Sequence, residues 1–157
     1  GEWMPARGAE QAHLKTVPLT LPAKDDRKQR TIHTLSMPVS SGDQPPVILQ
    51  PETKIRVRGK IASSHRIWFG MTLCRENGDF AGRFQTILPA EEFKSGEPFE
   101  VVLNLTDYHL DPSLAQWAES LPESPYGLIV KSVWCHTLWD PAGLQVSEIA
   151  LTTPTDK

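Results

Sequence analysis

The stretch HRIWFGMTLCRENGDFAGRFQTIL (His65–Leu88) decides the fold of this chain. Two runs in which apolar residues alternate with other residues flank Asn77-Gly78, a dipeptide typical of tight hairpin turns because both residues tolerate a positive φ. We therefore predict a β-hairpin with a type I′ turn at this dipeptide. Alternation with a period of two gives each strand two faces, only one of which packs in the core. The other face is expected to carry Trp68, Arg83 and Gln85.

The composition indicates one soluble domain. A chain of 157 residues with 39% apolar and 22% charged residues can bury one core of its own. The formal net charge of −3 gives no strong attraction to nucleic acid or to acidic membranes, so neither is expected as a partner. Cys74 and Cys135 either pair across a sheet or remain free buried thiols, and two cysteines alone are too few for a structural zinc site.

The remaining chain predicts more strands and one helix. Residues 1–29 lack sustained periodicity and are expected to form a linker or a loosely packed arm, with a short edge strand near Val17. Alternating strands are expected within residues 30–153, and residues 154–157 form a tail. Asp111-Pro112 has the residue types of a helix start, so one short helix is inserted late. Because helices do not alternate with strands, the pattern favours an all-β antiparallel sandwich or barrel.

Several strand motifs follow one another in a recognisable order. They are KIRVRGKI (54–61), the central hairpin, FEVVLNL (99–105), GLIVKSVW (127–134) and GLQVSEIAL (143–151). Over about residues 30–153 this order resembles the galactose-binding-like β-jelly-roll domains, which include many carbohydrate-binding modules attached to secreted glycoside hydrolases. The resemblance implies an antiparallel β-sandwich of jelly-roll type without catalytic activity, located outside the cell or at its surface.

The same resemblance implies a ligand and a site. The ligand would be a polysaccharide or oligosaccharide, bound on a concave face or at the loop rim, and a covalently attached glycoside hydrolase domain would be a further partner. Many members of the family hold a structural calcium ion. We find no convincing cluster of carboxylates for calcium in this sequence, so the resemblance leaves a structural calcium as an open expectation.

Sugar binding needs flat aromatic faces beside planar hydrogen-bonding groups. Trp68 is a stacking platform if Ile67 and Phe69 face the core, and a core residue if they do not. Trp134 and His136 share one face of their strand while Trp139 is on the other, so only one of these sets can face the core. The candidate ligand-binding residues are Trp68, Arg83, Gln85, Asn104, Trp134, His136 and Trp139.

Two of the aromatic and polar residues have other interpretations. Asn104 interrupts an apolar strand and also begins the glycosylation sequon Asn-Leu-Thr. Trp117, on the expected helix, is predicted to pack in the core.

Catalytic motifs do not stand out. The sequence has no GxSxG, HExxH or phosphate-binding glycine loop, and neither cysteine has a context that lowers the pKa of its thiol. We therefore expect a non-catalytic carbohydrate-binding module that recognises a polysaccharide through tryptophan stacking and hydrogen bonds from Arg, Gln and Asn. The alternative is a protein-interaction or structural accessory domain of the same fold. A small hydrolase or lyase is a third hypothesis with less support.

Overall fold

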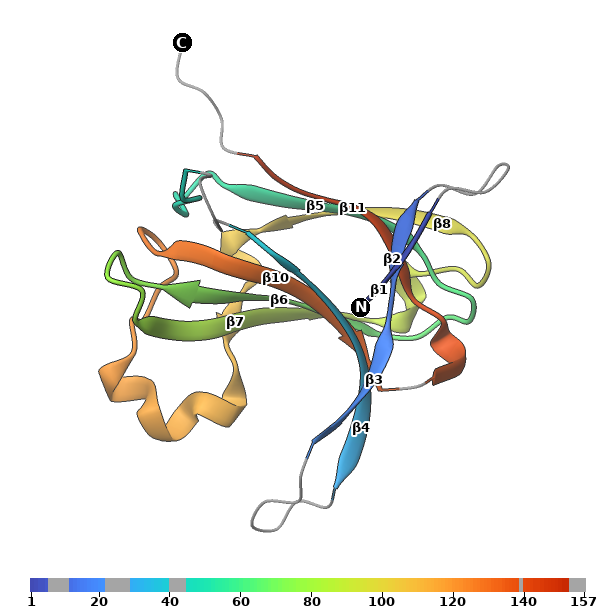
Figure 1. Cartoon of the computed structure of the whole chain (residues 1–157), viewed down its shortest axis with the longest axis horizontal. Coiled ribbons are helices and arrows are strands. Elements are labelled where there is room, and N and C mark those ends of the chain that lie inside the picture. Colours follow the sequence, from blue (N-terminus) through green and yellow to red (C-terminus); the bar gives the residue numbers. More distant parts are fainter. Residues whose placement is uncertain (6–11, 22–28, 40–44, 139, 153–157) are drawn as a thin grey trace.

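The computed structural model is a sandwich of two β-sheets, and it describes residues 1–5, 12–21, 29–39, 45–138 and 140–152 (Figure 1). Every strand pair in the described part of the chain is antiparallel, which confirms the predicted all-β sandwich. The five-stranded sheet has the order β1 (Glu2–Met4), β2 (His13–Lys15), β11 (Gln145–Thr152), β5 (Lys54–Lys60) and β8 (Pro98–Asn104). The six-stranded sheet has the order β3 (Val17–Leu21), β4 (Arg30–Pro38), β10 (Ile129–Thr137), β6 (Ile67–Cys74), β7 (Phe80–Leu88) and β9 (His109–Leu110).

Short 3₁₀ segments connect several strands: η1 (Ala90–Glu92), η2 (Leu105–Asp107), η3 (Pro112–Ser120) and η4 (Asp140–Ala142). The expected late helix is η3, which begins at Pro112, and the N–H of Leu114 donates to the carbonyl of Asp111 at 2.9 Å. In Figure 1, η3 and the connected ends of β3 and β4 project away from the five-stranded sheet. The η3 segment and the β3–β4 pair therefore flank the outer face of the six-stranded sheet.

The segment expected to be a linker or arm supplies three strands. β1 and β2 pair with each other at the edge of the five-stranded sheet, and β3 is an edge strand of the six-stranded sheet. Only Thr16 separates β2 from β3, so the chain passes from one sheet to the other within one residue. Pro18 is compatible with β3 because an edge strand has one row of N–H groups that need no partner. Sequence periodicity was weak here because these strands are short.

The central hairpin forms with a different turn from the one predicted. The N–H of Gly78 donates to the carbonyl of Arg75 at 2.8 Å, so the turn is centred one residue earlier than expected, and Gly78 follows it with φ of 89°. The Asn77 side chain stabilises this arrangement by accepting a hydrogen bond from the N–H of Asp79 at 3.0 Å. A register shift next to the turn leaves Phe80 opposite Cys74 and 48% exposed, away from the core.

The core lies between the two sheets. Phe69, Phe84 and Phe93 are almost completely buried, and the ring of Phe93 meets that of Phe99 edge to face at 4.9 Å. On β5, Ile55 and Val57 alternate with exposed or half-buried basic residues, as expected for a strand with one face in the core. This core fixes which residues of each strand point outward, and thereby positions the surfaces described below.

Candidate functional site

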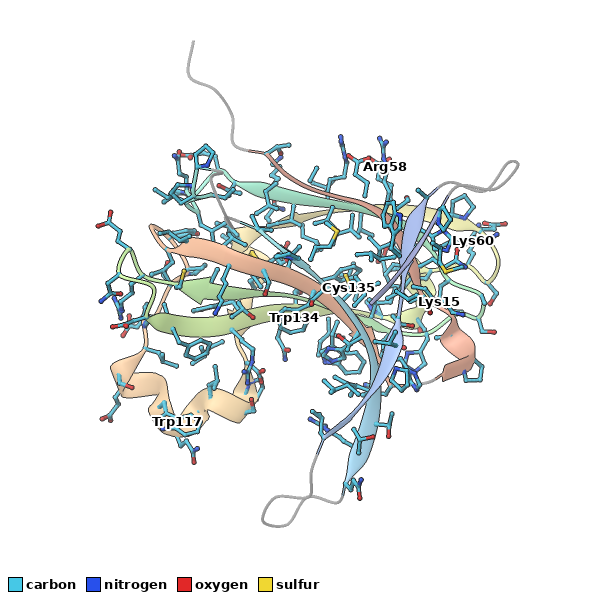
Figure 2. The ribbon with its side chains drawn as sticks, in the orientation of Figure 1. Lys15, Arg58, Lys60, Trp117, Trp134 and Cys135 are labelled. Carbon is cyan, nitrogen blue, oxygen red and sulfur yellow. The ribbon has the colours of Figure 1, made fainter. Side chains whose placement is uncertain are left out.

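Two tryptophans and a histidine lie on the outer face of the six-stranded sheet. Trp68 comes from β6, and Trp134 and His136 come from β10; all three are half-buried. Their neighbours along the strands, Phe69 and Cys135, are buried between the sheets. Figure 2 shows Trp134 and Cys135 on opposite sides of β10. The structure thereby decides the choice of face that the sequence left open.

The three rings form a continuous stack, which we call the ring stack (Trp68, His136 and Trp134). The centroids of Trp68 and His136 are 5.0 Å apart with an angle of 17° between the ring planes. Those of His136 and Trp134 are 5.4 Å apart with an angle of 9°. The guanidinium carbon of Arg66 lies 5.0 Å from the Trp68 ring centroid, which extends the stack by a cation–π contact.

Gly70 makes room for the ring stack. Gly70 on β6 is the register partner of Trp134 on β10, and a Cβ at Gly70 would lie 2.1 Å from Cζ2 of Trp134. The indole therefore occupies the space that any other residue at position 70 would fill. Its N–H is buried, and no described residue accepts a hydrogen bond from it. Sequence analysis did not single out Gly70, although a glycine within a strand often marks the close approach of another group.

The environment of His136 keeps its imidazole neutral. Burial and, to a smaller extent, the positive charge of Arg30 lower the pKa of His136 to about 4, against the opposing effect of the Asp111 carboxylate. Arg30 begins β4 and Asp111 precedes η3, so the two segments that flank this face both act electrostatically on the ring stack. At neutral pH the middle ring is an uncharged aromatic surface with one N–H donor and one acceptor nitrogen.

Arg83 anchors the start of η3 to the same sheet. Its Nε lies 3.2 Å from Oδ2 of Asp111, and its Nη2 donates to the hydroxyl of Ser113 at 3.2 Å. Burial raises the pKa of Asp111, but hydrogen bonds from Ser113 and Arg83 outweigh burial, so the pKa of this carboxyl is lower than usual. Arg83 thus has an intramolecular carboxylate partner, which reduces its availability for an acidic ligand.

The structure brings five of the seven candidate residues to one face. Gln85 on β7 is the register partner of Gly70 on β6, and Gly70 is in turn the register partner of Trp134 on β10. Register partners lie on the same face of a sheet, so Gln85 shares the face of Trp134. Asn104 lies elsewhere, at the end of β8 in the five-stranded sheet, where its N–H donates to the carboxylate of Asp107 at 3.2 Å. Trp139 lies outside the described residues. The residues on the outer face of the six-stranded sheet are Trp68, Arg83, Gln85, Trp134 and His136.

Two expectations about other side chains are resolved. Trp117 does not pack in the core, because it is 47% exposed. Figure 2 shows it on η3, away from the two sheets. Cys74 and Cys135 are free. Cys135 on β10 lies opposite Phe69 on β6, whereas Cys74 lies at the far end of β6, opposite Ile129. The two cysteines are therefore several positions apart along the strands, roughly 15–20 Å at the rise of a strand. A disulfide needs Cα atoms within about 7 Å, so these thiols cannot pair.

Within the described part of the chain, no group of three or more His, Cys, Asp or Glu side chains is placed to hold a metal ion. None of the helices described is long and apolar enough to cross a membrane.

Comparison with known proteins identifies no family. No protein-family model matches the sequence, and no curated protein matches it. A function for this domain must therefore be argued from the ring stack and its surroundings.

Proposed function

We propose that this domain is a non-catalytic carbohydrate-binding module that holds a polysaccharide against the outer face of the six-stranded sheet. The observation that carries the proposal is the ring stack, which places two indoles and a neutral imidazole together on a solvent-facing sheet surface. The apolar C–H face of a pyranose packs well on aromatic surface, and the solvent-exposed parts of the half-buried Trp68 and Trp134 side chains would supply it.

Polar groups beside the ring stack supply the hydrogen bonds that a sugar needs. Gln85 lies on the same face, two strands from Trp134, and its amide both donates and accepts. Arg66, at the Trp68 end of the stack, presents a guanidinium that is exposed to solvent. An aromatic platform with an amide at one side and a guanidinium at its end fits a chain of hydroxylated rings.

Affinity electrophoresis across a panel of neutral and acidic polysaccharides tests the proposal. We expect one class of glycan to retard the domain, and Trp68→Ala to weaken that binding at least tenfold, because central aromatic anchors contribute about 2 kcal/mol or more. Trp3→Ala is the matched control, since Trp3 is 63% exposed on β1 of the other sheet, and it should bind like the wild type.

Gln85→Ala keeps the test decisive if Trp68→Ala fails to fold. This variant removes a half-buried surface amide, so the domain should stay folded and bind several-fold more weakly. A folded wild-type domain that no glycan retards would refute the proposal. In that case a dimer in size-exclusion chromatography that dissociates on Trp68→Ala would instead indicate a protein-interaction domain.

A further inference from the structure

A row of basic residues runs along β5 on the outer face of the five-stranded sheet. Lys54, Arg56, Arg58 and Lys60 alternate with residues that face the core. At the rise of a strand, neighbouring cations are about 7 Å apart and the whole row is about 20 Å long. Lys15 on β2 lies on the same face as Lys60, because both are register partners of Gln145 on β11, the strand between them. We call these five residues the basic row.

Among the described residues, carboxylates pair with the two arginines of the basic row but not with its lysines. Glu148 contacts Arg56 at 2.6 Å and Arg58 at 3.2 Å, and Glu100 contacts Arg58 at 3.3 Å. In the described part of the chain, none of the three lysines forms an ion pair. The hydrogen bond with Glu148 raises the pKa of Arg56, so this guanidinium stays charged.

The basic row is an unusual concentration of positive charge for this chain. The sequence has 19 acidic and 16 basic residues, yet the described strands of this face carry five basic residues against three carboxylates, the third being Glu2 opposite Lys15. In Figure 2, Arg58 lies beyond the five-stranded sheet and Trp134 on the side of the six-stranded sheet, so the basic row and the ring stack are on opposite faces.

The shape and chemistry of this face favour a linear sulfated or carboxylated chain. Four of its five residues follow one strand, and a depression of ≈ 370 Å³ beside that strand is lined by Arg58, Pro98, Glu100, Ser147 and others. The outward positions of β5, β8 and β11 carry no aromatic residue, so nucleobases would find no stacking platform there. Only Val102 is a large exposed apolar side chain on these strands, which is too little to insert into a lipid surface.

We propose that the basic row binds a linear acidic polysaccharide along β5, with sulfate or carboxylate groups held by its lysines, because Arg56 and Arg58 already pair with carboxylates of this face. The ring stack takes no part in this contact. The inference therefore stands on charge alone and does not depend on the proposed function of the opposite face.

Binding of heparin, as a sulfated probe, to the purified domain tests the inference. At about 50 mM salt, Lys54→Ser/Lys60→Ser should bind heparin about tenfold or more weakly than the wild type, since each substitution removes a cation that neutralises one charge of the polyanion. The control is Arg75→Ser/Lys131→Ser, which removes one exposed charge from the turn after β6 and one from β10 and should change binding less than about twofold. Trp68→Ala should leave heparin binding unchanged.

Three results would overturn the inference. The first is a wild-type domain that does not bind heparin at low salt, and the second is an equal loss of binding in the two double variants. The third is tighter binding of an oligothymidylate or of phosphatidylserine vesicles than of heparin, which would make the occupant a nucleic acid or a membrane. Neutral-glycan binding that is lost in Trp68→Ala but kept in Lys54→Ser/Lys60→Ser would support the proposed function separately.

Discussion

Replacing Gly70 with alanine should disrupt the ring stack without altering the backbone. The φ of Gly70 is not positive, so alanine can adopt its conformation, and the only conflict is steric. The new Cβ would lie 2.1 Å from Cζ2 and 2.2 Å from Cη2 of Trp134. Carbon atoms in good contact are about 3.5–4.0 Å apart, so the indole must retreat by more than about 1 Å and slide against His136.

The expected cost follows from two opposing effects. Overpacking of this kind costs about 1–3 kcal/mol, whereas glycine to alanine in a strand returns about 0.5–1 kcal/mol through the unfolded chain. We expect Gly70→Ala to lower the free energy of unfolding by about 1–2 kcal/mol, which corresponds to a fall in Tm of roughly 2–8 °C for a domain of this size. Near-ultraviolet circular dichroism should also lose intensity, because the indole leaves its fixed environment.

A double-mutant cycle with Trp134→Ala isolates the contact. Once the indole is removed, Gly70→Ala should no longer destabilise the domain and should stabilise it slightly. The coupling energy, measured by urea unfolding of the four proteins, should be about 1–3 kcal/mol. Equal effects of Gly70→Ala with and without the Trp134 ring would refute this account of how the indole is positioned.

Three further measurements probe the surroundings of the ring stack and the thiols. The pKa of His136 is about 4 in the folded chain and near 6.5 when unfolded, so the unfolded state binds the proton first as the pH falls. The free energy of unfolding should therefore be about 2 kcal/mol lower at pH 4.5 than above pH 6.5 because of His136. Urea titrations at both pH values should show that this decrease is absent in His136→Gln. A thiol reagent should label Cys74 in the folded domain but Cys135 only in urea. Cys135 is buried, and burial raises the pKa of its thiol to about 12. Two fast-reacting thiols in the folded domain would contradict this expectation. Asp111→Ala should lower stability by about 1 kcal/mol, and Arg83→Ala should add little in that background; additive losses would show that the two residues act separately.

Part of the candidate site could be read from the sequence because alternation is a local property. Alternation assigns the residues around Trp68 and around Trp134 to two faces of each strand. In the structure, the residues assigned to one face do lie on one face. Alternation does not say which set faces the core, since both sets contain apolar residues. Packing between the sheets decides this, because Phe69 and Cys135 fill the interior and leave the tryptophans outside.

Contacts between strands could not be read in this way. Gly70 and Trp134 are 64 residues apart in the sequence, and they meet because β6 and β10 are neighbours in a particular register. The position of Asn104 on the other sheet has the same origin: strand order assigns β8 to the five-stranded sheet. Trp117 has helical spacing with apolar neighbours, but η3 is a 3₁₀ segment that extends beyond the sandwich, and it buries Leu114 while leaving Trp117 47% exposed.

The sequence by itself determined the longer strands after residue 30, the central hairpin and the all-β class of this protein, because turn residues and alternation act within a few residues of the chain. Only the tertiary structure decided the turn geometry, the separation of the two thiols and the union of Trp68, His136 and Trp134 in one stack. Those features depend on which strands lie side by side and in which register. That choice is set by the free energy of packing two whole sheets together, to which every strand contributes.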